Sequence, residues 1–333
     1  MTRPAGTKAL LGGLSVLVLM LFFLSLLTGP ADISPVDSLR VLVSPDDSAL
    51  TLVMWEIRLP RALLGLMIGA SLGLSGAVLQ GYLRNPLAEP GLLGVSASAS
   101  LGAVVAIHSG LAAAFALALP LMALVGALAC VVALHLLAGR MGSALTVILA
   151  GVALSSLAGA MTSLVLNLSS NPFAALEIVF WMLGSLADRS MVHVYLAAPF
   201  MLAGWALLAG LGRMLDTLTL GPDTAASMGT SMRRVGLLAT FGTALSVGAA
   251  TAVAGAIGFV GLIVPHLLRP LVGSQPSRLL PASALGGACL LLAADVAVRL
   301  IAPERDLKLG VLTAAIGAPF FLWLVIKHRR SAA

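Results

Sequence analysis

The sequence predicts an all-α membrane protein that crosses the bilayer about ten times. Of its 333 residues, 59% are hydrophobic and only 10% are charged, whereas about a quarter of the residues in an ordinary soluble domain are charged. The apolar residues form long continuous runs, and a helix needs about 20 of them to cross the hydrocarbon. The runs lack the two-residue alternation of membrane strands. We therefore expect one transmembrane domain of bundled helices over residues 1–333.

Ten apolar runs define the expected spans, with boundaries set by charged residues and turns. The first run follows Arg3 and Lys8. It is long for a signal peptide and no small-residue cleavage site follows it, so we interpret it as a retained helix. The seventh and eighth runs are continuous, and Gly255 and Gly258 mark the expected break between them. The runs cover residues 9–29, 61–83, 91–108, 113–137, 144–167, 192–212, 235–257, 258–273, 279–300 and 309–327.

The distribution of charge orients the chain. With the N-terminus inside, the cytoplasmic segments hold most of the lysines and arginines, and the outer segments hold most of the acidic residues, as the positive-inside rule requires. Ten spans then place both the N- and C-termini in the cytoplasm. The net charge of +6 is thus a consequence of topology, and it gives no reason to expect binding to nucleic acid.

Three connections are too long to be simple turns. The segment 30–60 is expected on the outer side, as is the segment 168–191, in which Asn171 and Pro172 precede a short helix. The segment 213–234 is expected in the cytoplasm. Its turn at 221–224 predicts a short helix from Ala225 to Met232, ending near Gly229. The residue pattern alone leaves open whether this helix lies on the membrane surface or docks a soluble partner.

Motifs for catalysis and metal binding are absent from the sequence. There is no G-x-x-x-x-G-K-[ST] phosphate loop, so the chain is not expected to hydrolyse ATP itself. We find no zinc-protease motif, no nucleophile elbow and no Cys/His cluster with metal-ligand spacing. Cys130 and Cys289 lie within apolar runs and are interpreted as packing residues. No catalytic residue, metal or cofactor is expected.

Asp295 is the only acidic residue that we place well inside an expected span. It precedes Arg299 by one helical turn, a spacing that favours an ion pair over a proton-conducting carboxylate. An ion-coupled secondary transporter is therefore disfavoured relative to a transporter driven from outside the chain. A purely structural membrane scaffold is the other alternative.

Seven segments from the second span to the last form a more specific pattern. They are IRLPRALLGLMIGASLGLSGAVLQ (57–80), NPLAEPGLLGVSASASLGA (85–103), LAGVALSS (149–156), WMLGSL (181–186), GAIGFVGLIVPHLLR (255–269), LLPASALGGACLLLAADVAVR (279–299) and GAPFFLWLV (317–325). With these motifs the chain resembles the permease subunits of type II ABC importers, the FecCD/BtuC-like family of iron-siderophore, haem and vitamin B12 uptake.

The resemblance implies a homodimer of ten-helix permeases in the bacterial inner membrane. It also implies two ATP-binding-cassette ATPase subunits on the cytoplasmic side and a periplasmic substrate-binding protein outside. The expected substrate is an iron(III)-siderophore-type chelate. The string NPLAEPGLLGVS is closer to the cobalamin branch, so vitamin B12 remains an alternative, as does haem.

The resemblance further assigns roles to individual positions. The family's ATPase-coupling helix corresponds to Gly221, Pro222, Asp223, Ala225, Ala226, Met228, Gly229, Met232 and Arg233. Its arginines that receive carboxylates of the binding protein correspond to Arg58, Arg61 and Arg299. Its translocation path and inner gate correspond to Asn85, Pro86, Leu87, Ser155, Ser156 and Thr162. The segment Arg305–Gly310 departs from the family pattern, which leaves open how this loop meets the binding protein.

Overall fold

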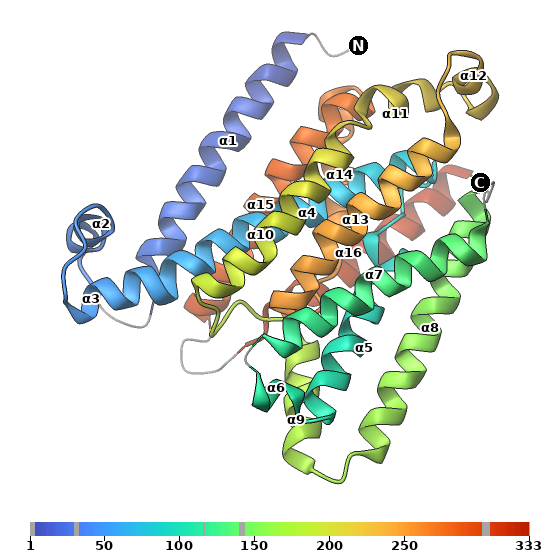
Figure 1. Ribbon diagram of the computed structural model, residues 1–333. Coiled ribbons are helices and arrows are strands. Elements are labelled where there is room, and N and C mark those ends of the chain that lie inside the picture. The colour runs from blue at the N-terminus through green and yellow to red at the C-terminus, as the bar shows by residue number, and fades with distance from the viewer. Residues whose placement is uncertain (1–3, 30–32, 116, 140–143, 302–306, 333) are drawn as a thin grey trace.

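The computed structural model describes residues 4–29, 33–115, 117–139, 144–301 and 307–332, and this part of the chain is a helical bundle without strands (Figure 1). The long helices are α1 (Pro4–Leu27), α4 (Leu59–Tyr82), α5 (Val95–His108), α7 (Ala118–Ala138), α8 (Ala144–Leu168), α10 (Met191–Ala209), α13 (Met232–Ala254), α15 (Pro276–Ile301) and α16 (Leu309–Ala332). The short ones are α2 (Pro35–Val43), α3 (Ala49–Leu52), α6 (Leu111–Ala114), α9 (Pro172–Met182), α11 (Gly212–Leu218), α12 (Pro222–Ser227) and α14 (Val260–Leu268). A π-helix η1 (Val53–Arg58) and two 3₁₀ turns, η2 (Pro90–Leu93) and η3 (Pro270–Val272), complete the set.

Seven helical segments in the described part of the chain are long and apolar enough to cross a membrane. They are Gly6–Leu27, Ala49–Tyr82, Ala118–Ala138, Ala144–Leu168, Met191–Ala209, Met232–Ala254 and Pro276–Ile301. Val95–His108, Pro172–Met182 and Leu309–Leu324 are shorter apolar helices. The all-α prediction is confirmed for the described residues, whereas the expected number of about ten spans is only partly matched.

Three expected elements differ from the structure. Helical structure already begins at Ala49 and continues to Tyr82, so the second span starts well before residue 61. The apolar run 258–273 forms only the nine-residue α14 and the turn η3. The short helix expected from Ala225 to Met232 is α12, which begins earlier, at Pro222, because proline is well suited to the first turn of a helix. Met232 belongs to the first turn of α13 instead.

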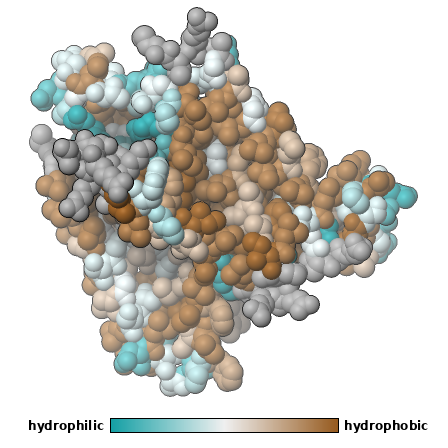
Figure 2. Space-filling model, turned by 180° about the vertical axis from the view of Figure 1, so that it is seen from behind, coloured by the Kyte–Doolittle hydropathy of each residue, from teal (hydrophilic) through white to brown (hydrophobic). Residues whose placement is uncertain are grey.

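Both ends of the chain and α12 lie toward one end of the bundle, and α2, α3 and α9 lie toward the other (Figure 1). We call these the inner and outer ends, following the orientation expected from the sequence. A band of apolar side chains crosses the middle of the molecule, with hydrophilic side chains gathered toward its extremities (Figure 2). This distribution is what a bilayer imposes, because only the ends of the helices reach water.

The central helix α4 packs against its neighbours through glycines. A Cβ on Gly69 would lie 2.8 Å from the Cα of Ala288 in α15, and a Cβ on Gly73 would collide with the carbonyl oxygen of Ser283. Further along, Gly76 faces the backbone of Gly261 in α14 with equally little space. Small residues permit this approach, and close packing replaces the hydrophobic force that is missing between helices in lipid.

Substitution of Gly73 by leucine is expected to destabilise the bundle, because the new side chain would force α4 away from α15. Overpacking a tight interface costs about 1–3 kcal/mol, which thermal unfolding of the purified protein in detergent would detect. Gly12→Leu in α1 is the matched control, since no heavy atom of the described residues outside its neighbours and its own helix backbone lies within 4 Å of its Cβ position. Equal melting temperatures for the two variants would contradict close packing at Gly73.

Candidate functional site

The segment expected to couple to an ATPase protrudes from the inner end of the bundle (Figure 1). Ala225 is fully buried, whereas Pro222, Asp223, Ala226, Met228 and Gly229 are exposed. The hydroxyl groups of Thr217 and Thr230 lie 2.8 Å apart and join the two sides of the protrusion. The structure therefore presents α12 as a knob with one buried contact and several accessible side chains.

Two glycines frame this knob. Gly221 has φ +106° and Gly229 has φ +85°, values that L-residues with a side chain rarely adopt. Apart from the adjoining residues of the chain, no heavy atom of the described residues lies within 4 Å of the Cβ position of either glycine. The glycines are thus required by backbone conformation, and neither is required by crowding within the chain.

The knob is anchored to the bundle by Asp216, a residue that the sequence analysis did not single out. Its carboxylate accepts a hydrogen bond from the backbone N–H of Ser277, at 2.9 Å, and another from the side-chain amide of Gln275, at 3.2 Å. These bonds tie α11 to the start of α15, so a force on the knob acts directly on a long helix.

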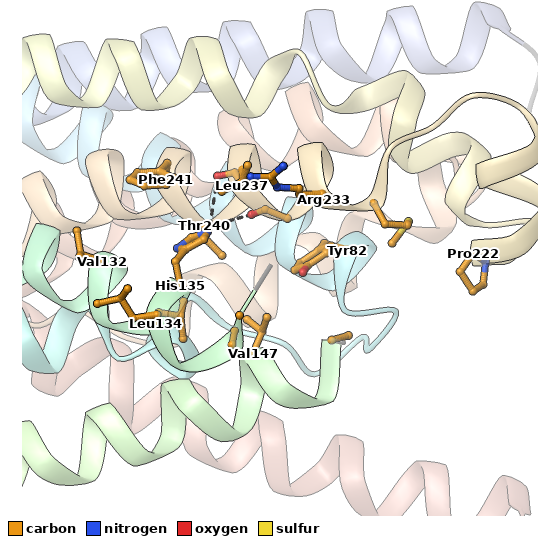
Figure 3. A pocket seen from close by; sticks show the side chains of 16 residues that line it. Tyr82, Val132, Leu134, His135, Val147, Pro222, Arg233, Leu237, Thr240 and Phe241 are labelled. Carbon is orange, nitrogen blue, oxygen red and sulfur yellow. Dashed lines mark hydrogen bonds between the residues drawn. The ribbon is translucent and has the colours of Figure 1, made fainter. Parts of the chain in front are cut away.

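A cavity of about 910 Å³ lies beside the knob, between the inner ends of α7, α8 and α13. Pro222, Arg233 and Tyr82 line it, together with His135 and Thr240, which point toward each other across its wall (Figure 3). The imidazole Nε2 of His135 and the hydroxyl oxygen of Thr240 are 3.2 Å apart. Most of the remaining lining is aliphatic.

The expected gate residues Asn85, Pro86 and Leu87 form a tight turn at the inner end of α4. The side-chain oxygen of Asn85 accepts a hydrogen bond from the backbone N–H of Leu87, at 2.9 Å, the geometry of an Asx turn. Arg84 begins the turn with φ +50°. The chain then re-enters the bundle through η2, where Gly94, at φ +78°, starts α5.

The outer end carries a buried carboxylate that is held by two arginines. Asp295 in α15 is 1% exposed. It lies 2.9 Å from a terminal nitrogen of Arg61 and 2.8 Å from one of Arg299. The Nε of Arg61 donates to both oxygens of the same carboxylate, at 2.9 and 3.2 Å. The pairing of Asp295 with Arg299 predicted from their spacing is confirmed, and Arg61 is a second partner that the local pattern could not reveal.

Arginines of this cluster also cap the last turn of α1. Arg299 donates to the carbonyl oxygens of Ser25 and Thr28, at 2.9 and 2.6 Å, and Arg58 donates to that of Leu26, at 3.0 Å. The last carbonyls of a helix lack intrahelical partners, and cations stabilise them. The family resemblance assigns these arginines to docking of the binding protein, but Arg58 is only 4% exposed and the side chain of Arg299 only 9%. Arg61, at 18%, is the most accessible of the three.

The outer segment between α2 and α3 is organised by Asp46. Its carboxylate accepts hydrogen bonds from the hydroxyls of Ser48 and Thr51. These bonds favour the ionised form and lower the pKa of Asp46 to about 2. The carboxylate is therefore charged at any pH near neutrality, and it fixes the start of α3.

The expected path residues on α8 occupy different environments. Ser156 is exposed and Ser155 is half-buried, whereas Thr162 is only 5% exposed. Thr162 therefore points into its own chain, and Ser156 lies on the face that this chain leaves uncovered.

The sequence and the fold are both similar to those of known membrane transport proteins. Residues 17–327 match the model of the FecCD transport family. The vitamin B12 import system permease BtuC of Citrobacter koseri is 38% identical over 321 residues, which cover 96% of this chain and 94% of that protein. The hemin transport system permease HmuU of Yersinia pestis is 38% identical, covering 83% and 85%. The Fe(3+) dicitrate transport system permease FecD of Escherichia coli is 39% identical, covering 83% and 86%.

A solved structure extends the similarity to the fold. It is an inward-facing conformation of an ABC transporter assigned to the metal-chelate type, with a TM-score of 0.85 and 33% identity, covering 96% of this chain and 99% of that one. Relatives with this level of identity are permease subunits, and ATP hydrolysis resides in a partner of the permease. The resemblance inferred from the motifs is thereby confirmed: this multi-pass membrane protein belongs to the FecCD transport family and is an ABC importer permease.

Proposed function

We propose that this chain carries an iron(III)-siderophore-type chelate across the bacterial inner membrane as one half of a homodimeric permease. The family match over residues 17–327 is the observation that carries the proposal. Relatives named for Fe(3+) dicitrate and hemin support a chelate as substrate, and the relative named for vitamin B12 supports cobalamin as the alternative. Two ATPase subunits drive the cycle, and a periplasmic binding protein delivers the substrate.

The exposed apolar face of α8 supports dimerisation. Leu145, Leu149 and Leu157 are 65%, 61% and 56% exposed in the single chain. In the proposed dimer a second copy covers part of this face, and Ser155 and Ser156 border the path between the copies. Thr162 is buried among helices of its own chain. In this proposal it therefore contributes to the packing of α8 and does not line the path.

An ion-coupled secondary transporter is less well supported. Proton-coupled transporters of this class usually carry an ionisable side chain at mid-membrane that is free to exchange a proton. Asp295 is instead bound by both Arg61 and Arg299, so it is not a free carboxylate. Energy from an ATPase at the inner end is consistent with this arrangement.

Uptake into proteoliposomes that contain the permease, its cognate ATPase and its binding protein tests the proposal. A labelled ferric siderophore, labelled cobalamin and haem would be offered in parallel, with and without ATP. We expect ATP-dependent uptake of the ferric siderophore. Uptake of cobalamin or haem alone would replace the substrate and leave the transport class intact. Uptake that is independent of ATP would instead support a secondary transporter.

The exposed knob at α12 supports a coupling role for Gly221, Pro222, Asp223, Ala225, Ala226, Met228 and Gly229. Met232 and Arg233, in the first turn of α13, adjoin it. In the proposed mechanism the knob sits in a groove of the ATPase, so closure of the ATPase dimer moves α11 and, through Asp216, the start of α15. The permease then changes between outward- and inward-facing arrangements as packed units.

Two variants of Gly229 distinguish a role in docking to the ATPase from a requirement for the backbone conformation of glycine. Gly229→Asn tolerates a positive φ but adds a side chain, whereas Gly229→Ala adds little volume and disfavours the conformation by about 1 kcal/mol. If the ATPase packs against this point, Gly229→Asn is expected to reduce uptake per ATP hydrolysed more strongly than Gly229→Ala. A full rescue of coupling by asparagine would show that only the backbone conformation matters. Unchanged coupling in both variants would exclude the docking role.

We propose that Arg61 receives a carboxylate of the binding protein at the outer rim. It is the most exposed arginine of its cluster. Arg58 and Arg299 are more deeply buried and bind the carbonyl groups at the end of α1. Asp295 holds the guanidinium of Arg61 near the surface. Rim charges mainly steer association.

Arg61→Ala is expected to weaken binding of the cognate binding protein by about fivefold at low salt, measured by surface-immobilised permease in nanodiscs. Arg40→Ala, which removes an exposed arginine from α2, is the control and should bind within about twofold of the parent. An Arg61→Ala variant that melts normally and binds like the parent would argue against the docking role.

A further inference from the structure

The chain breaks between α13 and α14 in an unusual conformation. α13 ends at Ala254, residues 255–258 are not helical, and Phe259 precedes α14 with φ +68°. A bulky aromatic residue rarely adopts this left-handed conformation, and one that does is fixed by its surroundings. The contacts of Phe259 therefore indicate which parts of the bundle hold the break in place.

Two contacts fix Phe259. Its backbone N–H donates to the Oε1 of Glu89, at 3.2 Å. Its side chain packs against Gly317 in α16 so closely that a Cβ at Gly317 would collide with the ring. The first contact comes from the segment that follows the turn Asn85–Leu87, and the second comes from the last long helix. Phe259 thus lies at a junction of three elements that are distant in the sequence.

The same segment holds α14 at neighbouring points. Pro90, next to Glu89, lies so near Gly261 that a Cβ on this glycine would be 2.8 Å from the proline ring. At the other end of α14, the guanidinium of Arg269 donates to the side-chain oxygen of Gln80 at 2.7 Å. Gln80 and Glu89 stand before and after the turn Asn85–Leu87 in the sequence. Both sides of this turn are therefore bonded to the region of α14.

We propose that Glu89 is a positioning residue for translocation: by holding the amide of Phe259, its carboxylate makes the turn Asn85–Leu87, α14 and α16 move as one unit. The glutamate provides a hydrogen-bond acceptor at a helix start, where the N–H groups lack intrahelical partners. The inference rests on the proposed function and on the role of inner gate that the family resemblance implies for the turn. It adds the connection by which α14 and α16 move that gate.

Hydrogen–deuterium exchange of the permease–ATPase complex tests the connection between Glu89 and Phe259 without a transport measurement. Loss of this hydrogen bond in Glu89→Leu is expected to speed exchange of peptides covering 255–262 by about tenfold. Glu89→Gln retains the accepting oxygen and should stay within about twofold of the parent. Glu177→Leu, which removes an exposed glutamate from α9, is the matched control and should leave this region unchanged.

A second variant guards against misfolding of Glu89→Leu. Gly317→Ala pushes on the Phe259 ring from α16 without touching Glu89. If the three elements form one unit, exchange should rise both in 255–262 and in 83–94. A rise confined to α16 would overturn the inference.

Transport provides the functional measurement. Glu89→Leu is expected to retain basal ATP hydrolysis within about twofold while uptake per ATP falls about fivefold, because the gate no longer follows α14. A merely structural defect would lower both together. Equal impairment of Glu89→Gln and Glu89→Leu, or normal uptake per ATP in Glu89→Leu, would overturn the positioning role. Absence of ATP-dependent uptake in the parent protein would contradict the proposed function, and the exchange experiment would still report on the connection itself.

Discussion

Close approach of helix backbones is the constraint on which the structure depends. Lipid tails are as apolar as the helix side chains, so burying these side chains against another helix gives no hydrophobic free energy. Helices in lipid therefore associate through close packing at small residues. α4 meets α15 at Gly69 and Gly73 and meets α14 at Gly76. This helix also carries Arg61 near its outer end and leads into the turn at Asn85 at its inner end. The element most tightly enclosed by glycine contacts therefore connects the two ends at which partners are proposed to bind.

The helical class could be predicted from sequence because length and apolar composition are local properties. The break near Gly255 could also be predicted, since glycine ends helices at positive φ. The extent of α14 could not, because a helix buried among protein helices has the same apolar composition as one that faces lipid. Composition cannot distinguish nine helical residues followed by a turn from a complete span. Pro222 is a signal for the first turn of a helix and marks the start of α12. The apolar residues after it led to the prediction of a later start, at Ala225.

Side-chain environments at the site were less predictable, and the reason is sequence separation. The family resemblance assigns Arg58 and Arg61 to docking of the binding protein and says nothing of their partners within the chain. The partner of Arg61, Asp295, is 234 positions away, and only the fold brings the two together. Glu89 and Phe259 are 170 positions apart and escaped notice for the same reason. The family resemblance assigns Thr162 to the path, and the burial of Thr162 depends on which neighbouring helices cover α8, a property that the sequence of α8 alone does not contain.

The capping of α1 has a consequence for biogenesis. α1 leaves the ribosome before the helices that it contacts, and few of its side chains are buried in the bundle. The carbonyl groups of Ser25 and Thr28 at its end are bound by Arg299, 274 and 271 positions later. α1 therefore cannot complete these hydrogen bonds until α15 has been synthesised. Until then, the carbonyl groups at its end must be satisfied by water, lipid headgroups or the insertion machinery. The last turn of α1 thus acquires its final partners only when a helix much later in the chain has been inserted.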